Sequence, residues 1–170
     1  GEGAAQVLAS ALPGKFCQKR VCGPYEKRVQ ASYYLAKSGM GIVELAEAAG
    51  LTLAAQEERR PLYSTTFGVG ELLLDAVSNG AAQLCLTLGG SATNDGGVGM
   101  LQALGYAFLD KDGKQVLPGA RGLKDITEIT AAYVIPELAE CKFRVACDVT
   151  NPLCGEFGCS SIYGPQKGAT

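Results

Sequence analysis

Short apolar runs that alternate with polar and glycine-rich turns predict an α/β fold for this chain. Residues 28–36 favour a strand, because tyrosine, valine and partial alternation suit a half-buried pleated surface. Residues 42–46 fit either a short strand or the first turn of a helix, and a solvent-facing position would explain the charged Glu44 among them. The apolar residues 83–88 and 142–147 predict two further strands, the first of them buried.

The clearest helix is predicted over residues 68–78. Thr65 and Thr66 precede it with hydroxyls that can cap its first turn, and Asn79-Gly80 follows it as a stop signal. Four apolar residues on one side would make its buried face: Leu72, Leu73, Ala76 and Val77.

A second helix is predicted to end at Gly105. Beyond it, two runs of β-favouring residues, 106–109 and 114–117, flank the sequence Asp-Lys-Asp-Gly. Asp-Gly between such runs is a strong hairpin signal, so these two runs are expected to pair with each other.

A glycine-rich stretch, residues 89–97, joins the strand at 83–88 to this second helix. A strand, a glycine-rich loop and a helix in this order can build an anion site, because glycines allow close approach and helix-start amides point at the ligand. The stretch matches neither the P-loop nor the dinucleotide spacing, and glycine turns also serve only to reverse the chain. Its candidate ligand-binding residues are Gly89, Gly90, Ser91, Thr93, Asn94 and Gly96.

Asp95 is the unexpected residue of this stretch. A carboxylate inside an anion cradle repels phosphate unless a metal or a proton lies between them, which indicates chemistry as well as binding. The alternative is that Asp95 simply caps the following helix.

Two more polar clusters contain candidate site residues. Asp148 and Asn151 follow the strand at 142–147, where open α/β sheets place ligand groups. Lys167, between a proline turn and a glycine, is either an exposed phosphate contact or an ordinary surface lysine. Because two of the three clusters begin where an apolar strand ends, we expect all three to converge on one face of the sheet.

Composition narrows the chemistry further. The chain has 170 residues, 47% of them hydrophobic, and a net charge of -2, so it is globular and shows no basic patch for nucleic acid. It has no histidine, which excludes histidine-based proton transfer within the chain and makes a conventional metal site improbable. Seven cysteines without C-x-x-C spacing read as reduced thiols and favour the cytoplasm, and no apolar run is long enough to span a membrane.

The three clusters together resemble the bacterial glycerate kinase type 1 family. The segments that carry the resemblance are GGSATNDGGVGMLQALG at 89–105, RVACDVTNPLCG at 144–155 and GPQKGAT at 164–170, with support from VELAEAAGL at 43–51 and TTFGVGELLLDA at 65–76. The opening GEG resembles the end of that family's DGGEG motif. The family's D-S-[FY]-K and T-G-E-G-x-x-D segments do not occur here.

The resemblance implies an α/β domain with a mixed sheet and flanking helices. Residues 1–170 would form a single domain, a fragment of the domain inserted in a two-domain kinase, with the Rossmann-like flanks of the same polypeptide absent. The start at Gly1 without methionine fits an excerpt of a longer chain. A homo-oligomer is left open.

The resemblance also implies ATP-dependent phosphorylation of D-glycerate, at either of its hydroxyls, with Mg²⁺. Asp95, Asp148 and Lys167 are then the catalytic candidates, and Asp95 and Asp148 the Mg²⁺ candidates, because Mg²⁺ takes one or two carboxylates plus phosphates. Asp95 is favoured beside the reacting centre, while Lys167 would neutralise a carboxylate or phosphate. The isolated chain is expected to be inactive. The alternatives are a non-catalytic module that binds a small carboxylate or phosphate, and a purely structural domain.

Overall fold

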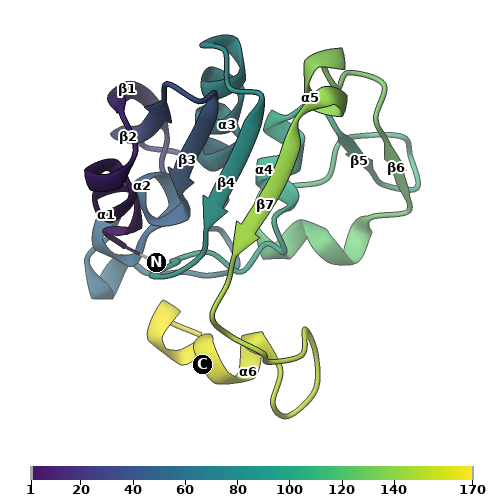
Figure 1. Ribbon diagram of the computed structural model, residues 1–170. Helices are drawn as coiled ribbons and strands as arrows, with labels where there is room; N and C mark the ends of the chain where they lie inside the picture. The colour runs from purple at the N-terminus through teal and green to yellow at the C-terminus, as the bar shows by residue number, and fades with distance from the viewer. Residues whose placement is uncertain (1, 170) are drawn as a thin grey trace.

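A mixed five-stranded sheet forms the centre of the molecule (Figure 1). The computed structural model describes residues 2–169. The strands lie in the order β1-β2-β3-β4-β7, where β1 is Gly14–Cys22, β2 is Arg28–Ala36, β3 is Met40–Glu44, β4 is Gln83–Thr87 and β7 is Lys142–Ala146. The pairs β1–β2 and β2–β3 are antiparallel, and β3–β4 and β4–β7 are parallel. The predicted α/β class and mixed sheet are confirmed.

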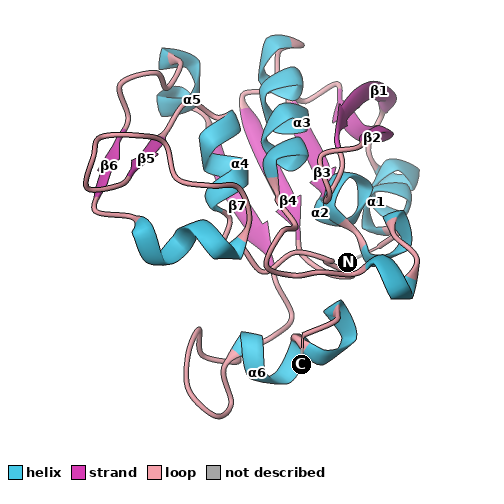
Figure 2. Cartoon of the chain, turned by 180° about the vertical axis from the view of Figure 1, so that it is seen from behind, coloured by secondary structure: helices cyan, strands magenta, loops and turns pink. Residues whose placement is uncertain are grey.

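Helices cover the two faces of this sheet unequally. Their bounds are α1 Ala4–Ala11, α2 Leu45–Ala49, α3 Phe67–Ser78, α4 Val98–Ala103, α5 Pro136–Glu140 and α6 Cys159–Tyr163. Seen from behind, α3 and α4 lie over the sheet (Figure 2), and α3 buries Leu72 and Leu73 against residues of β3 and β4. The other face packs Ala5 of α1 against Tyr34 and Ile42 in a smaller cluster.

The predicted strands at 28–36, 83–88 and 142–147 are confirmed, as is the helix at 68–78. Strand β1 was not predicted from the sequence, because most of its side chains are exposed and its polar residues obscure the alternation. Residues 42–46 contain both of the predicted elements, a strand and the first turn of a helix, since β3 ends at Glu44 and α2 starts at Leu45.

Glu44 does not face solvent, contrary to the sequence-based interpretation. It is 6% exposed, and its carboxylate accepts hydrogen bonds from the amides of Gly3 at 3.0 Å and Ala5 at 2.6 Å. The start of α1 supplies donors that offset the cost of burying this charge. Glu44 is therefore a buried cap for a helix that lies across the sheet.

The predicted hairpin between 106–109 and 114–117 forms over a short stretch, where Leu109 and Gln115 make an isolated antiparallel bridge and the Val116 amide donates to the Phe108 carbonyl at 2.9 Å. The turn forms, with the Asp110 amide bonded to the Lys114 carbonyl at 2.8 Å. However, β5 (Ala107–Leu109) pairs with β6 (Glu128–Thr130). The side-chain oxygen of Gln115 takes the Phe108 amide at 2.7 Å, which interrupts a backbone ladder on the other edge.

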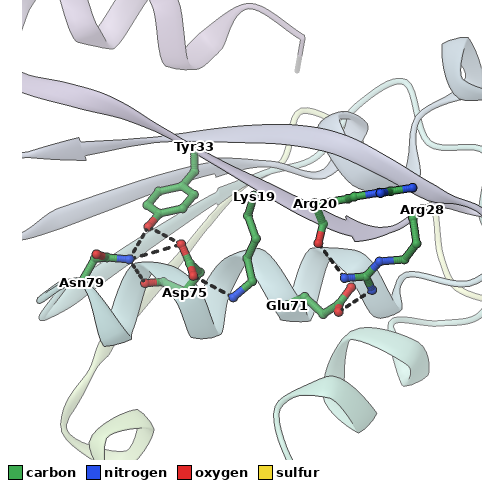
Figure 3. Close-up of polar contacts among 7 residues, drawn as sticks. All are labelled: Lys19, Arg20, Arg28, Tyr33, Glu71, Asp75 and Asn79. Atoms are coloured by element: carbon green, nitrogen blue, oxygen red, sulfur yellow. Dashed lines mark hydrogen bonds and ion pairs between the residues drawn. The ribbon is translucent and has the colours of Figure 1, made fainter.

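A polar network fastens α3 to the antiparallel strands β1 and β2 (Figure 3). Tyr33 donates to Asp75 at 2.8 Å, Lys19 pairs with the same carboxylate at 2.7 Å, and Asn79 donates to the Tyr33 hydroxyl at 3.0 Å. Burial, reinforced by hydrogen bonding to Asp75, raises the pKa of Tyr33. Tyr33 is only 1% exposed, so its hydroxyl depends on these partners.

We expect Tyr33→Phe to lower the free energy of unfolding by about 1–2 kcal/mol, because it removes the buried hydroxyl that donates to Asp75 and accepts from Asn79. Urea unfolding followed by circular dichroism measures this loss. Tyr133→Phe is the control, since Tyr133 is 77% exposed. Equal stability of the two variants would contradict a stabilising role for the network.

Candidate functional site

The three polar clusters meet at the carboxyl ends of the parallel strands. A cavity of about 270 Å³ is lined by Gly89, Gly90 and Ser91 after β4, by Asp148 after β7, and by Lys167 near the end of the chain. In Figure 1 the segment after β7 turns back beneath the ends of β4 and β7. The expected convergence is confirmed for these five residues. We call this space the first cavity.

Lys167 is buried rather than exposed, which corrects both sequence-based interpretations of it. It is 8% exposed, and its ammonium donates to the Ser91 hydroxyl at 2.8 Å and the Thr93 carbonyl at 2.6 Å. Gly168, at φ 90°, ends the short helical turn at residues 165–167 in a left-handed conformation that glycine adopts readily. Burial lowers the pKa of Lys167, while the nearby Cys159 and Asp95 oppose this shift.

Gly89, Gly90 and Ser91 line the first cavity beside this ammonium. The amides of Gly89, Gly90 and Ser91 donate to no acceptor within residues 2–169. Neighbouring loop groups are paired, because Leu51 donates to the Gly90 carbonyl at 2.8 Å and Ala92 donates to the Ala49 carbonyl at 2.8 Å. Successive amides without an acceptor, beside a buried cation, are the groups from which anion-binding concavities are built, and the Glu2 carboxylate also lies against Gly90.

The start of α4 does not provide the anion site that the sequence suggested, because Asp95 itself occupies it. The Asp95 carboxylate accepts from the amides of Gly97 at 3.1 Å and Gly99 at 3.2 Å. It also accepts from the Thr66 amide at 2.8 Å and the Thr66 hydroxyl at 2.9 Å. Asp95 is 1% exposed and caps the first turns of both α3 and α4, so the capping alternative holds.

The capping of α3 also differs from the expected pattern. Thr65 accepts from the Phe67 amide at 3.2 Å, as a capping hydroxyl should. The Thr66 hydroxyl instead donates to the Asp95 carboxylate and accepts from the Met100 amide at 2.9 Å. One threonine therefore joins the two helix starts.

The remaining candidate residues lie outside the first cavity. Thr93 is buried and contributes its carbonyl to Lys167, while Gly96 is exposed. Asn94 lines a neighbouring second cavity of about 350 Å³. Asn151 is used within its own segment, where it donates to the Phe157 carbonyl at 3.1 Å and accepts from the Tyr163 hydroxyl at 2.8 Å. Asn94, Gly96 and Asn151 thus make no contact that assigns them to an anion site.

Sequence reasoning missed several lining residues. Cys159, Tyr163 and Gln166 are among the other residues that line the first cavity, and Arg60 and Tyr63 are among those that line the second. These side chains gather only through the fold, although Arg59-Arg60-Pro61 could have drawn attention as a basic pair before a turn.

A metal would have few protein ligands here. Within the described part of the chain, no three carboxylates or thiols gather closely enough to hold an ion. The oxygens of Asp95 already accept four hydrogen bonds, whereas Asp148 is exposed and lines the first cavity. A cation such as Mg²⁺, which keeps water and phosphate ligands, fits Asp148 better than Asp95.

Comparison with known proteins identifies the family to which this chain belongs. The model of the glycerate kinase family matches residues 1–170. Curated relatives include a glycerate kinase from Halalkalibacterium halodurans, 44% identical over all of this chain and 45% of its own length, and a glycerate 2-kinase from Escherichia coli K12, 43% identical over the same shares. The structure of a glycerate kinase 2 from Salmonella typhimurium LT2 superposes with a TM-score of 0.96 at 41% identity, over 100% of this chain and 46% of that one. The chain belongs to the glycerate kinase family.

The chain spans about half the length of the curated relatives that it matches. In residues 2–169, no helix has both the length and the apolar character that crossing a membrane requires.

Proposed function

We propose that the protein carrying this chain transfers a phosphoryl group from ATP to D-glycerate, and that the first cavity is part of its active site. The observation that carries this proposal is the pairing of an anion-binding wall with a carboxylate. The free amides of residues 89–91 and the Lys167 ammonium would hold negative charge, and Asp148 faces the same space. A small hydroxy acid and a phosphate group need both features.

In this mechanism, Lys167 and the loop amides neutralise charge on glycerate or on the phosphoryl group in transfer. A hydroxyl oxygen of glycerate forms the new bond to the γ-phosphorus as the bond to the ADP oxygen breaks, and Asp148 accepts the hydroxyl proton. Asp95 holds the loop and the two helix starts in place. We propose the 2-hydroxyl as the acceptor, since one relative is called a glycerate 2-kinase.

Mg²⁺, when bound, would neutralise the β- and γ-phosphates of ATP. Asp148 is the carboxylate of this chain that would hold it, and in that case Asp148 would be a ligand instead of the proton acceptor. Asp95, proposed as a second ligand by the resemblance, would first have to release the amides it now caps. The seven free cysteines support a reducing compartment, and we propose a cytoplasmic location.

ADP release with and without D-glycerate tests this function, and phosphorus NMR of the product identifies the hydroxyl that reacts. We expect glycerate-dependent turnover, and a loss of about 10²–10⁴-fold in kcat in Asp148→Asn. Asp112→Asn, in an exposed turn, is the matched control. Tight binding of glycerate without turnover by the full-length protein would favour a binding module instead.

A further inference from the structure

The second cavity adjoins the first and has a different chemical character. It is lined by Arg60, Leu62, Tyr63 and Asn94 on one side and by Gly164 and Gly168 on the other. Leu62 is 57% exposed and Tyr63 is 50% exposed, so an aromatic and an aliphatic surface are open to a ligand. Its volume of about 350 Å³ is in the range of small-molecule sites.

Positive charge surrounds this apolar surface. Arg60 lines the cavity, and the Arg121 guanidinium carbon lies 4.8 Å from the centre of the Tyr63 ring. Neither arginine, nor the adjacent Arg59, has a carboxylate within 4.0 Å in the described residues. The Arg59 Nε is buried without a hydrogen-bond partner, although its terminal nitrogens reach the Gln166 and Leu51 carbonyls. Arginines without a carboxylate partner, beside an aromatic ring, suit an anionic ligand with a planar ring.

The two cavities are lined in part by residues that are adjacent in the chain. Lys167 lines the first cavity and Gly168 the second, and the Lys167 ammonium is bonded to Thr93, the neighbour of Asn94. A second bridge, from the Asn94 amide to the Ser160 hydroxyl at 3.0 Å, closes the second cavity against α6. The two cavities are thus lined by residues that are neighbours in the chain at Lys167-Gly168, on either side of the same segment.

We propose that the second cavity binds a nucleoside triphosphate, with the base against Tyr63 and Leu62 and the phosphates directed past Arg60 toward the first cavity. This inference rests on the proposed function and deepens it, because it assigns the phosphoryl donor to this part of the polypeptide. The acid acceptor then occupies the first cavity, beside Asp148.

Kinetics separate the two ligands. Arg60→Met and Tyr63→Ala are expected to raise the KM for ATP roughly 5- to 100-fold, the range for a lost ionic contact or base stack, while the KM for glycerate changes less than about twofold. Tyr63→Phe keeps the ring and should stay near the wild type. An increase in the KM for glycerate, or no change in either, would overturn the assignment.

Direct binding separates the failure of this inference from the failure of the proposed function. The chain has no tryptophan, so Tyr63→Trp places a reporter in the second cavity, and we expect saturable fluorescence change with ADP but little with tripolyphosphate at the same concentration. Tyr133→Trp, at a 77% exposed position outside both cavities, is the control. No response to ADP at Tyr63→Trp, or an equal response to tripolyphosphate, excludes a nucleoside here, whether or not the wild type phosphorylates glycerate.

Discussion

Lys167→Met is expected to lower kcat for glycerate phosphorylation by about 10²–10³-fold, the cost of losing one preorganised group that stabilises negative charge. Methionine matches the length of the lysine stem but carries no charge, so the loss would come from the ammonium. Steady-state kinetics of both substrates measure the effect. Lys111→Met, in the exposed turn after β5, should leave kcat and the KM values for both substrates unchanged.

Lys167→Arg tests whether charge alone is enough. The ammonium lies in a tight position, 2.8 Å from the Ser91 hydroxyl and 2.6 Å from the Thr93 carbonyl, which a planar guanidinium cannot reproduce. We expect arginine to restore little activity. A kcat within a few-fold of the wild type in Lys167→Met would remove this residue from the active site.

The stability of the wild type should depend on pH through Lys167. Burial lowers the pKa of Lys167 in the folded state, so between that value and the ordinary 10.5 the unfolded chain binds more protons. The free energy of unfolding contributed by this residue therefore rises with pH across that window. Lys167→Met should lose this rise, which unfolding at several alkaline pH values would show.

The second large effect is expected at Asp95. Asp95→Asn replaces one acceptor oxygen by an NH₂ group that faces amide donors, and it removes the charge from the remaining hydrogen bonds. Because this carboxylate is buried and holds two helix starts, we expect the free energy of unfolding to fall by about 2–4 kcal/mol. Urea unfolding measures the loss, with the exposed Asp112→Asn as control.

Turnover of the folded fraction then separates two roles for Asp95. If it only positions the loop, the residual activity of Asp95→Asn keeps the pH profile of the wild type and its kcat falls modestly. If it is the proton acceptor, kcat falls about 10²–10⁴-fold at every pH. A change of less than about 0.5 kcal/mol in unfolding would contradict the capping role that the hydrogen bonds define.

The sequence was sufficient for elements whose local pattern agrees with their environment. β2, β4 and α3 were predicted because β-favoured residues, a continuous apolar run and clear end signals coincide there. β1 was missed because it is an edge strand with mostly exposed side chains. The predicted hairpin is short because a side chain, Gln115, accepts from the backbone amide of Phe108, and no local signal predicts that β5 also pairs with β6.

The same distinction between local sequence signals and contacts made only by the fold applies to the candidate site. The glycine-rich loop, Asp148 and Lys167 could be brought together from the ends of strands and from the family motifs. Lys167 looked exposed because its burial depends on a loop 74 residues away. Arg60 and Tyr63 were not found, because no motif contains them and only the return of the chain after β7 places them in a cavity.

The single carboxylate that caps α3 and α4 has a consequence for motion. Asp95 links the Thr66 amide with the amides of Gly97 and Gly99, so the glycine-rich loop cannot swing away while both helix starts stay fixed. Opening would have to break these bonds together and release the first turns of both helices as one cooperative unit. The glycine-rich loop that supplies Gly89, Gly90 and Ser91 to the first cavity is therefore expected to keep its position for as long as both helix starts stay folded.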